Sequence, residues 1–133
     1  MRLFNRLLLQ KLKAIKNGPM IVTGDFNVAY SKLDLARPED NQQSTMFTVL
    51  ERQCLGELQN LGFADTFRSL HSEGGQYIWW PYSPDARERN IGWRIDYIFV
   101  SKDILPRLQN AFILKEVAGS DHSPVGIDID MEL

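Results

Sequence analysis

The stretch Arg94-Ile95-Asp96-Tyr97-Ile98-Phe99-Val100 alternates well enough between faces to predict a β-strand. One residue stands out within it, because Asp96 places a carboxylate in an otherwise apolar run. A carboxylate in such a place needs a partner, and an imidazole that it orients is an obvious one. The strand therefore predicts a sheet and a histidine close to Asp96.

Further strands and helices are expected on both sides of this strand. Leucines in the first 16 residues recur at helical spacing until Asn17-Gly18-Pro19, and Thr48 and Glu51 have the spacing of a capping box that opens a helix. The expected helices span 2–16, 48–60 and 101–108, the other expected strands span 20–23, 77–80, 111–116 and 125–131, and 31–45 is expected to be irregular. Since the chain contains no internal repeat, low-complexity tract or linker, we expect one α/β domain over residues 1–133 with a mixed sheet.

Length and composition fit a soluble globular domain. The chain has 133 residues, of which 44% are hydrophobic and 24% charged, and this length suffices to bury most of a core. No apolar run approaches the roughly 20 residues of a membrane helix, and the leucine-rich start lacks the features of a signal peptide, so we expect a cytoplasmic protein with no membrane contact. The single cysteine, Cys54, lies among leucines and is expected to be a buried structural thiol.

The net charge of −2 argues against a protein that coats nucleic acid non-specifically. It leaves an enzyme open, because carboxylates that hold a metal add negative charge where DNA must still bind. The net charge alone therefore does not determine the function.

Gly24-Asp25-Phe26-Asn27 follows the strand expected at 20–23. Such a segment can be an Asx turn that closes a connection between a strand and the next element. It can also be catalytic, because a carboxylate and an amide two residues apart in an extended segment project to the same side. In that case Asp25 could accept a proton from water while the Asn27 amide donates to a phosphate oxygen.

Ser120-Asp121-His122-Ser123-Pro124 precedes the strand expected at 125–131. Alone, an Asp-His pair in a loop is often a solvated surface turn. Here the following strand would anchor the pair, and a loop restricted by Pro124 can aim both side chains at one point. The anchoring favours a functional role for Asp121 and His122.

All three tryptophans lie within 15 positions, at Trp79, Trp80 and Trp93. Aromatic residues of this kind are normally core residues, and we expect this of Trp80. The segment 81–90 between them is polar and basic and is poorly suited to covering a core. Rings next to arginines are typical of surfaces that stack on bases and sugars of nucleic acid.

Taken together, these motifs resemble the endonuclease/exonuclease/phosphatase superfamily. The resemblance is closest to exodeoxyribonuclease III and the class II apurinic/apyrimidinic endonucleases. It rests on Gly24-Asp25-Phe26-Asn27, Trp79-Trp80, Asn90-Ile91-Gly92-Trp93-Arg94-Ile95-Asp96-Tyr97 and Ser120-Asp121-His122-Ser123-Pro124, which occur in this order and cover essentially the whole chain.

The resemblance implies the C-terminal half of a four-layer α/β sandwich, with one mixed, mostly antiparallel sheet and helices on one face. It implies that Asp25 activates or positions the attacking water, that Asn27 stabilises the transition state, and that Asp96 orients His122 toward the scissile phosphate. The implied ligands of Mg²⁺, or alternatively Mn²⁺, are Asp25, Asn27, Asp121 and His122. The implied DNA-binding residues are Trp79, Arg87, Asn90 and Trp93, of which Trp79 and Trp93 would line the pocket for a flipped-out abasic sugar.

The implied reaction is hydrolysis of the phosphodiester 5′ to an abasic site in double-stranded DNA, with 3′-5′ exonuclease or 3′-phosphatase action at 3′ ends as additional expectations. The family's first half supplies its chief Mg²⁺ ligand, a glutamate, for which this chain has no equivalent. We therefore expect little or no activity from the chain alone. The alternative is a non-catalytic half-domain that forms a homodimer or pairs with a separate N-terminal half.

Overall fold

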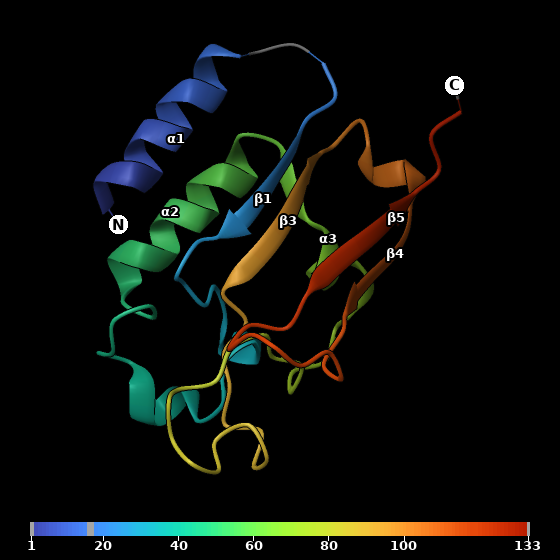
Figure 1. The fold of residues 1–133 in the computed structure, drawn as a ribbon. Coiled ribbons are helices and arrows are strands. Elements are labelled where there is room, and N and C mark those ends of the chain that lie inside the picture. Colours follow the sequence, from blue (N-terminus) through green and yellow to red (C-terminus); the bar gives the residue numbers. More distant parts are fainter. Residues whose placement is uncertain (1, 16–17, 133) are drawn as a thin grey trace.

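Strand β3 is the central element of the fold (Figure 1). The computed structural model describes residues 2–15 and 18–132. In it, β3 (Asp96–Ser101) lies between β1 (Ile21–Asp25) and β2 (Phe63–Asp65), and both neighbours run antiparallel to it. The register of β1 sets Asp25 directly opposite Asp96. Because directly opposite residues share a face of the sheet, the two carboxylates project to the same side.

A second sheet contains the last two strands. β4 (Leu108–Ile113) pairs antiparallel with β5 (Val125–Ile129), and β5 also contacts β3. The expected α/β class is confirmed, but the expected single sheet is divided into a three-stranded and a two-stranded sheet. Within the described residues, the strands of both sheets pair only in antiparallel orientation.

Two helices cover one face of the three-stranded sheet (Figure 1). These are α1 (Arg2–Ala14) and α2 (Val49–Asn60), and α2 begins at the expected capping box of Thr48 and Glu51. Burying one large apolar side chain in such a core stabilises the fold by about 1.5–3 kcal/mol. The core beneath the helices contains Leu9, Phe26, Val28, Leu55, Leu58, Phe63, Tyr97 and Phe99.

A short helix, α3 (Thr66–Leu70), follows β2 directly and contacts both β3 and β4. The sequence pattern predicted neither β2 nor α3, because a strand of three residues is too short to show alternation. Asp65 caps α3, since its side chain accepts a hydrogen bond from the Arg68 N–H. The β2–α3 unit therefore joins the two sheets.

Several expected boundaries were wrong. The strand expected at 77–80 is absent, because Trp79 makes only isolated bridges to Trp93 and His122. The helix expected at 101–108 is reduced to the 3₁₀ turn η3 (Leu105–Arg107), since Pro106 has no N–H to continue a helix. The segment 31–45, expected to be irregular, contains two more such turns. The bounds of β1, β3, β4 and β5 differ from the expected ones by a few residues. The expected last residue of the first helix, Lys16, and the first residue of its expected stop signal, Asn17, lie outside the described residues.

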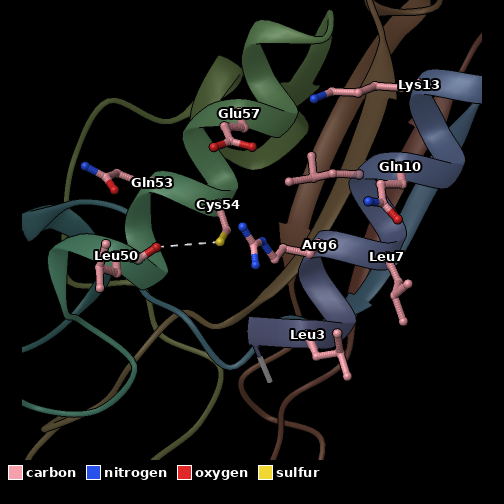
Figure 2. A pocket seen from close by; sticks show the side chains of 10 residues that line it. Leu3, Arg6, Leu7, Gln10, Lys13, Leu50, Gln53, Cys54 and Glu57 are labelled. Carbon is pink, nitrogen blue, oxygen red and sulfur yellow. Dashed lines mark hydrogen bonds between the residues drawn. The ribbon is translucent and has the colours of Figure 1, made fainter.

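A groove of about 770 Å³ runs between α1 and α2 (Figure 2). Cys54 lines it from α2, and its side chain and that of Arg6 from α1 point toward each other. The Cys54 thiol also donates a hydrogen bond to the Leu50 carbonyl at 3.5 Å. Cys54 is therefore only partly buried, whereas the sequence predicted a buried structural thiol. Across the described part of the chain, none of the helices has the length and apolar character to span a bilayer.

Candidate active site

The end of β1 and the turn after it carry the first two candidate residues. Asp25 is the last residue of β1 and is exposed. Asn27 has a left-handed backbone conformation, φ 51°, which asparagine tolerates better than most residues. Its N–H donates to Asp25 Oδ1 at 2.7 Å, so the Asx turn considered from the sequence is present. This turn holds the Asp25 carboxylate in one orientation and leaves its second oxygen for other contacts.

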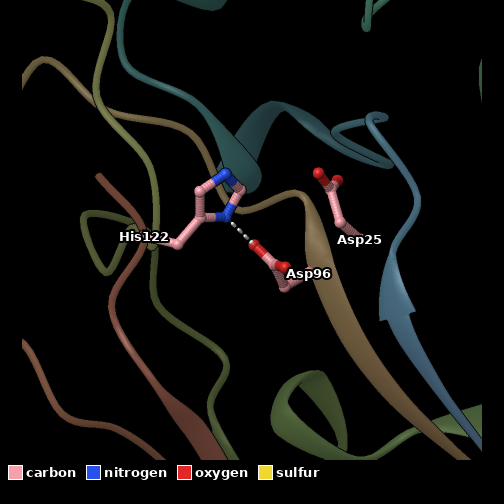
Figure 3. A group of neighbouring side chains, drawn as sticks. All are labelled: Asp25, Asp96 and His122. Atoms are coloured by element: carbon pink, nitrogen blue, oxygen red, sulfur yellow. Dashed lines mark hydrogen bonds and ion pairs between the residues drawn. The ribbon is translucent and has the colours of Figure 1, made fainter. Parts of the chain in front are cut away.

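The expected imidazole partner of Asp96 is His122. Nδ1 of His122 lies 2.7 Å from Asp96 Oδ2, and the other ring nitrogen points away from Asp96 (Figure 3). Burial raises the pKa of Asp96 above its ordinary value, the His122 hydrogen bond opposes that rise, and the charges of Asp25 and Asp121 add to it. The half-buried pair therefore fixes the ring of His122 with one nitrogen free to face a substrate.

Main-chain contacts bring His122 to this place. Trp79 pairs with Trp93 through two hydrogen bonds of 2.8 and 3.0 Å, and it also forms a bridge with His122. The Ser123 N–H donates to the Ile78 carbonyl at 2.8 Å. The segment around Trp79 thus lies between the segment of Trp93 and the loop of His122 and sets the distance between them.

Asp25, Asp96 and His122 form a group that could hold a cation. One ligand atom from each lies within 4.8 Å of the other two (Figure 3). Two carboxylates beside an imidazole suit a hard divalent cation that keeps several waters, as Mg²⁺ does. This group differs from the expected ligand set, because it contains Asp96, whereas the exposed Asp121 lies outside it.

Of the four expected DNA-binding residues, Trp79 and Trp93 pair with each other, whereas Arg87 and Asn90 contact Trp80 and other segments. The side chain of Trp93 is buried at 6% exposure, and that of Trp79 is half-buried against the same apolar cluster. The Asn90 amide donates to the Gly75 carbonyl at 2.9 Å. The Arg87 guanidinium donates to the Ser123 hydroxyl and to main-chain carbonyls of 115–120. Trp80 is buried, as expected of a core residue.

A buried charge cluster behind the site was missed by the sequence interpretation. Arg94 is 1% exposed and donates to Asp34 at 2.8 Å and to Asp65 at 2.6 and 3.1 Å. Asp34 also accepts from Arg68. The one signal in the sequence was Arg94 itself, which directly precedes the apolar run leading into β3 and needs acidic partners if it is buried.

Comparison with known proteins identifies the family. Residues 1–122 match the model of the Endonuclease/Exonuclease/phosphatase family. An exodeoxyribonuclease of Bacillus subtilis is 40% identical over 94% of this chain, which spans 50% of that protein. A DNA-(apurinic or apyrimidinic site) endonuclease of Dictyostelium discoideum is 38% identical over 92% of the chain and 34% of its own length.

A solved structure, the 3′ phosphatase NExo (D146N) from Neisseria bound to product DNA hairpin, superimposes with a TM-score of 0.86 at 29% identity. It covers 96% of this chain, which spans 51% of that protein, so the fold is the expected half of an α/β sandwich. The chain spans half or less of the length of these relatives. Both the sequence match and the superposition show that this chain belongs to the endonuclease/exonuclease/phosphatase family.

Proposed function

We propose that this chain carries one half of the active site of a DNA repair nuclease. The reaction is hydrolysis of the phosphodiester 5′ to an abasic site, with removal of nucleotides or phosphate from 3′ ends as related activities. The observation that carries the proposal is the convergence of Asp25, Asp96 and His122, which come from three distant parts of the chain. The names of the relatives support DNA as the substrate.

The geometry of the Asp25, Asp96 and His122 group supports the roles that we propose for these residues. Asp96 holds Nδ1 of His122, so the opposite nitrogen is left to contact a phosphate oxygen. Asp25 lies across the strand pair and takes the proton of an attacking water or positions that water. The Asn27 amide donates to a non-bridging oxygen as negative charge develops.

The donor set of Asp25, Asp96 and His122 fits Mg²⁺, or alternatively Mn²⁺, with Asn27 and Asp121 as further proposed ligands. A divalent cation held there would supply positive charge next to the phosphate. The proposed DNA-facing residues are Trp79, Arg87, Asn90 and Trp93. A Neisseria structure with a product DNA hairpin supports a DNA partner for this fold.

The test is cleavage of a labelled duplex that contains one abasic site, in Mg²⁺ and in EDTA. The chain is assayed alone and after mixing with a separately produced N-terminal half of the Bacillus subtilis exodeoxyribonuclease. We expect little or no cleavage by the chain alone and Mg²⁺-dependent cleavage by the mixture, which Asp25→Asn and His122→Ala each lower by about 10²-fold or more. Asp103→Asn, an exposed change beyond the opposite end of β3, is the matched control.

Two results would count against these statements. A mixture that forms a stable complex but does not cleave the abasic duplex contradicts the proposed function. Robust Mg²⁺-dependent turnover by the chain alone contradicts the proposed need for a second half. Parallel assays compare the rates of the related activities, with a 3′-recessed duplex for removal of nucleotides and a 3′-phosphate end for removal of phosphate.

A second candidate is an assembly module without activity of its own. Within the described residues β1 forms an edge of the three-stranded sheet, and Ile21 on it is 52% exposed. An open strand edge with exposed apolar side chains is suited to pairing with a second copy or with a separate N-terminal half. Sedimentation velocity tests this candidate, and a clean monomer at high concentration in the presence of that half would exclude it.

A further inference from the structure

A single buried hydroxyl connects the two halves of the candidate site. Tyr97 is 2% exposed, and its hydroxyl donates to the Val28 carbonyl at 2.7 Å and accepts from the Tyr30 N–H at 3.1 Å. The Arg94 carbonyl lies 3.1 Å from the same oxygen. One side-chain atom therefore serves main-chain groups both of the segment after β1 and of the residues that lead into β3.

The groups that the Tyr97 hydroxyl holds follow directly after Asn27. Pairing with β3 fixes the chain before this turn, where Asp25 lies opposite Asp96. After the turn, Val28 is fully buried, so water cannot replace a lost partner of its carbonyl. An unsatisfied buried group of this kind costs about 1–3 kcal/mol. The hydroxyl thus fixes the exit of the turn that carries Asp25 and Asn27.

The ring of Tyr97 is itself held from several sides. It stacks on Phe99 with centroids 5.2 Å apart and meets Phe26 edge-on at 5.7 Å. The Arg94 guanidinium lies 4.7 Å from the ring centroid, and Asp34 and Asp65 hold that guanidinium in turn. The position of the hydroxyl is therefore determined by the core and by the buried charge cluster.

Tyr97 is also the neighbour of Asp96 along β3. Successive side chains of a strand point to opposite faces, so Asp96 reaches His122 from one face while Tyr97 reaches the chain after Asn27 from the other. Two consecutive residues of one strand thus hold the two catalytic segments.

We propose that Tyr97 is a positioning residue, whose hydroxyl holds the Asp25–Asn27 turn in register with the Asp96–His122 pair. The use of this register for a cation and a phosphate rests on the proposed function, whereas the hold on the turn does not. Tyr97→Phe removes the hydroxyl and retains the ring that packs in the core. Tyr77→Phe is the matched control, because it also removes one hydroxyl from a buried tyrosine, and Tyr77 packs in a different apolar cluster.

The experiment measures amide hydrogen exchange and Mn²⁺ affinity at a temperature where both variants are fully folded. In Tyr97→Phe we expect faster exchange at Asn27 and Tyr30 and about tenfold weaker Mn²⁺ binding, the range found when a partner that orients a metal ligand is removed. In Tyr77→Phe both quantities should stay at their wild-type values, although the protein loses similar stability.

A purely structural role for the Tyr97 hydroxyl predicts equal Mn²⁺ affinity and equal exchange at the turn in the two variants, and that result would overturn the proposal. If the wild-type chain binds no Mn²⁺, the proposed cation site is contradicted. The exchange rate at Asn27, whose N–H bonds Asp25 rather than Tyr97, then still decides whether the hydroxyl holds the turn.

Discussion

The guanidinium of Arg87 lies over the indole of Trp80, with its central carbon 4.6 Å from the ring centroid. From this position it donates to the Lys115 carbonyl at 3.0 Å and to the Ser123 hydroxyl at 3.2 Å. Ser123 is buried and follows His122. The exposed side chain of Arg87 therefore braces the loop that delivers the imidazole, in addition to its proposed place on the DNA-facing surface.

Arg87→Lys should loosen this loop, because an ammonium group cannot reproduce several divergent hydrogen bonds and the stacking on Trp80. We expect faster amide exchange over 115–123 and a loss of about 0.5–1 kcal/mol in the free energy of unfolding. Arg89→Lys is the control, since Arg89 pairs only with Asp85 on the surface among the contacts described. If Arg87 serves DNA alone, loop exchange will not change and only DNA affinity will fall.

Asp96→Asn should separate stability from function. Because the pKa of Asp96 is raised in the folded state, its ionised carboxylate lowers the stability of the fold at high pH. The uncharged asparagine avoids this cost, so the variant should be as stable as the wild type or more stable at pH 8 in EDTA. The difference should shrink as the pH falls and the wild-type carboxyl takes up its proton. Thermal unfolding from pH 8 to pH 4 measures this, and divalent-cation affinity should fall in the same variant. A variant that is clearly less stable at pH 8 would show that the His122 contact outweighs the effect of burial.

Asp34→Asn should reduce stability in a way that depends on pH. Burial alone would raise the pKa of Asp34, but Arg94 and Arg68 hold it below its ordinary value. The resulting stabilisation is present above the unfolded-state pKa, about 3.9, and is lost as the pH falls through the lower folded-state pKa. We expect a loss of about 3 kcal/mol or more at pH 7, because the change removes one of the two carboxylates that pair with the buried Arg94 guanidinium and also the carboxylate that pairs with Arg68.

Urea unfolding at pH 7, 5, 4 and 3 measures this effect as the difference between wild type and Asp34→Asn. The difference should be constant above pH 5 and shrink toward pH 3. Asp85→Asn, which removes an exposed ion pair with Arg89, should change stability by only about 0–1 kcal/mol at every pH. A difference for Asp34→Asn that does not change with pH would contradict the assignment.

Two glycine substitutions should have opposite signs. In Gly92→Ala the new methyl group would meet Trp80 Nε1 at 2.5 Å and Tyr77 Cβ at 2.7 Å, so the backbone that leads to Trp93 must shift. We expect a loss of about 1–3 kcal/mol. In Gly56→Ala the new methyl group would lie 3.7 Å from the Tyr30 hydroxyl, which is an ordinary van der Waals distance. Because Gly56 lies within helix α2 and alanine favours a helix more than glycine does, we expect a gain of about 0.5–1 kcal/mol. Chemical unfolding of both variants checks the pair, and equal signs would contradict the packing described here.

The sequence predicted those parts of the site that depend on short-range pattern. The β3 run predicted a strand, and the isolated carboxylate of Asp96 predicted the imidazole that the structure provides in His122. The capping box at Thr48 predicted where α2 begins. In each case the signal lies within a few residues, so a linear pattern is enough to find it.

The parts that were missed depend on partners far along the chain. The three residues of β2 are a strand only because Ser101, Val100 and Phe99 pair with them. Trp79 was expected within a strand, but the bridges it makes to Trp93 and His122 stay isolated. Burial of Arg94 likewise requires Asp34 and Asp65, from positions 60 and 29 residues away. No local pattern encodes such contacts.

The register of β1 against β3 has a consequence for how this chain can change in evolution. Because side chains alternate along a strand, inserting or deleting one residue within Ile21–Asp25 would turn Asp25 to the opposite face from Asp96. Length changes in the irregular segment 31–45 carry no such penalty, except next to Asp34. Insertions and deletions should therefore be tolerated between the strands and excluded from β1, where a single added residue would leave the fold able to form but the carboxylates apart.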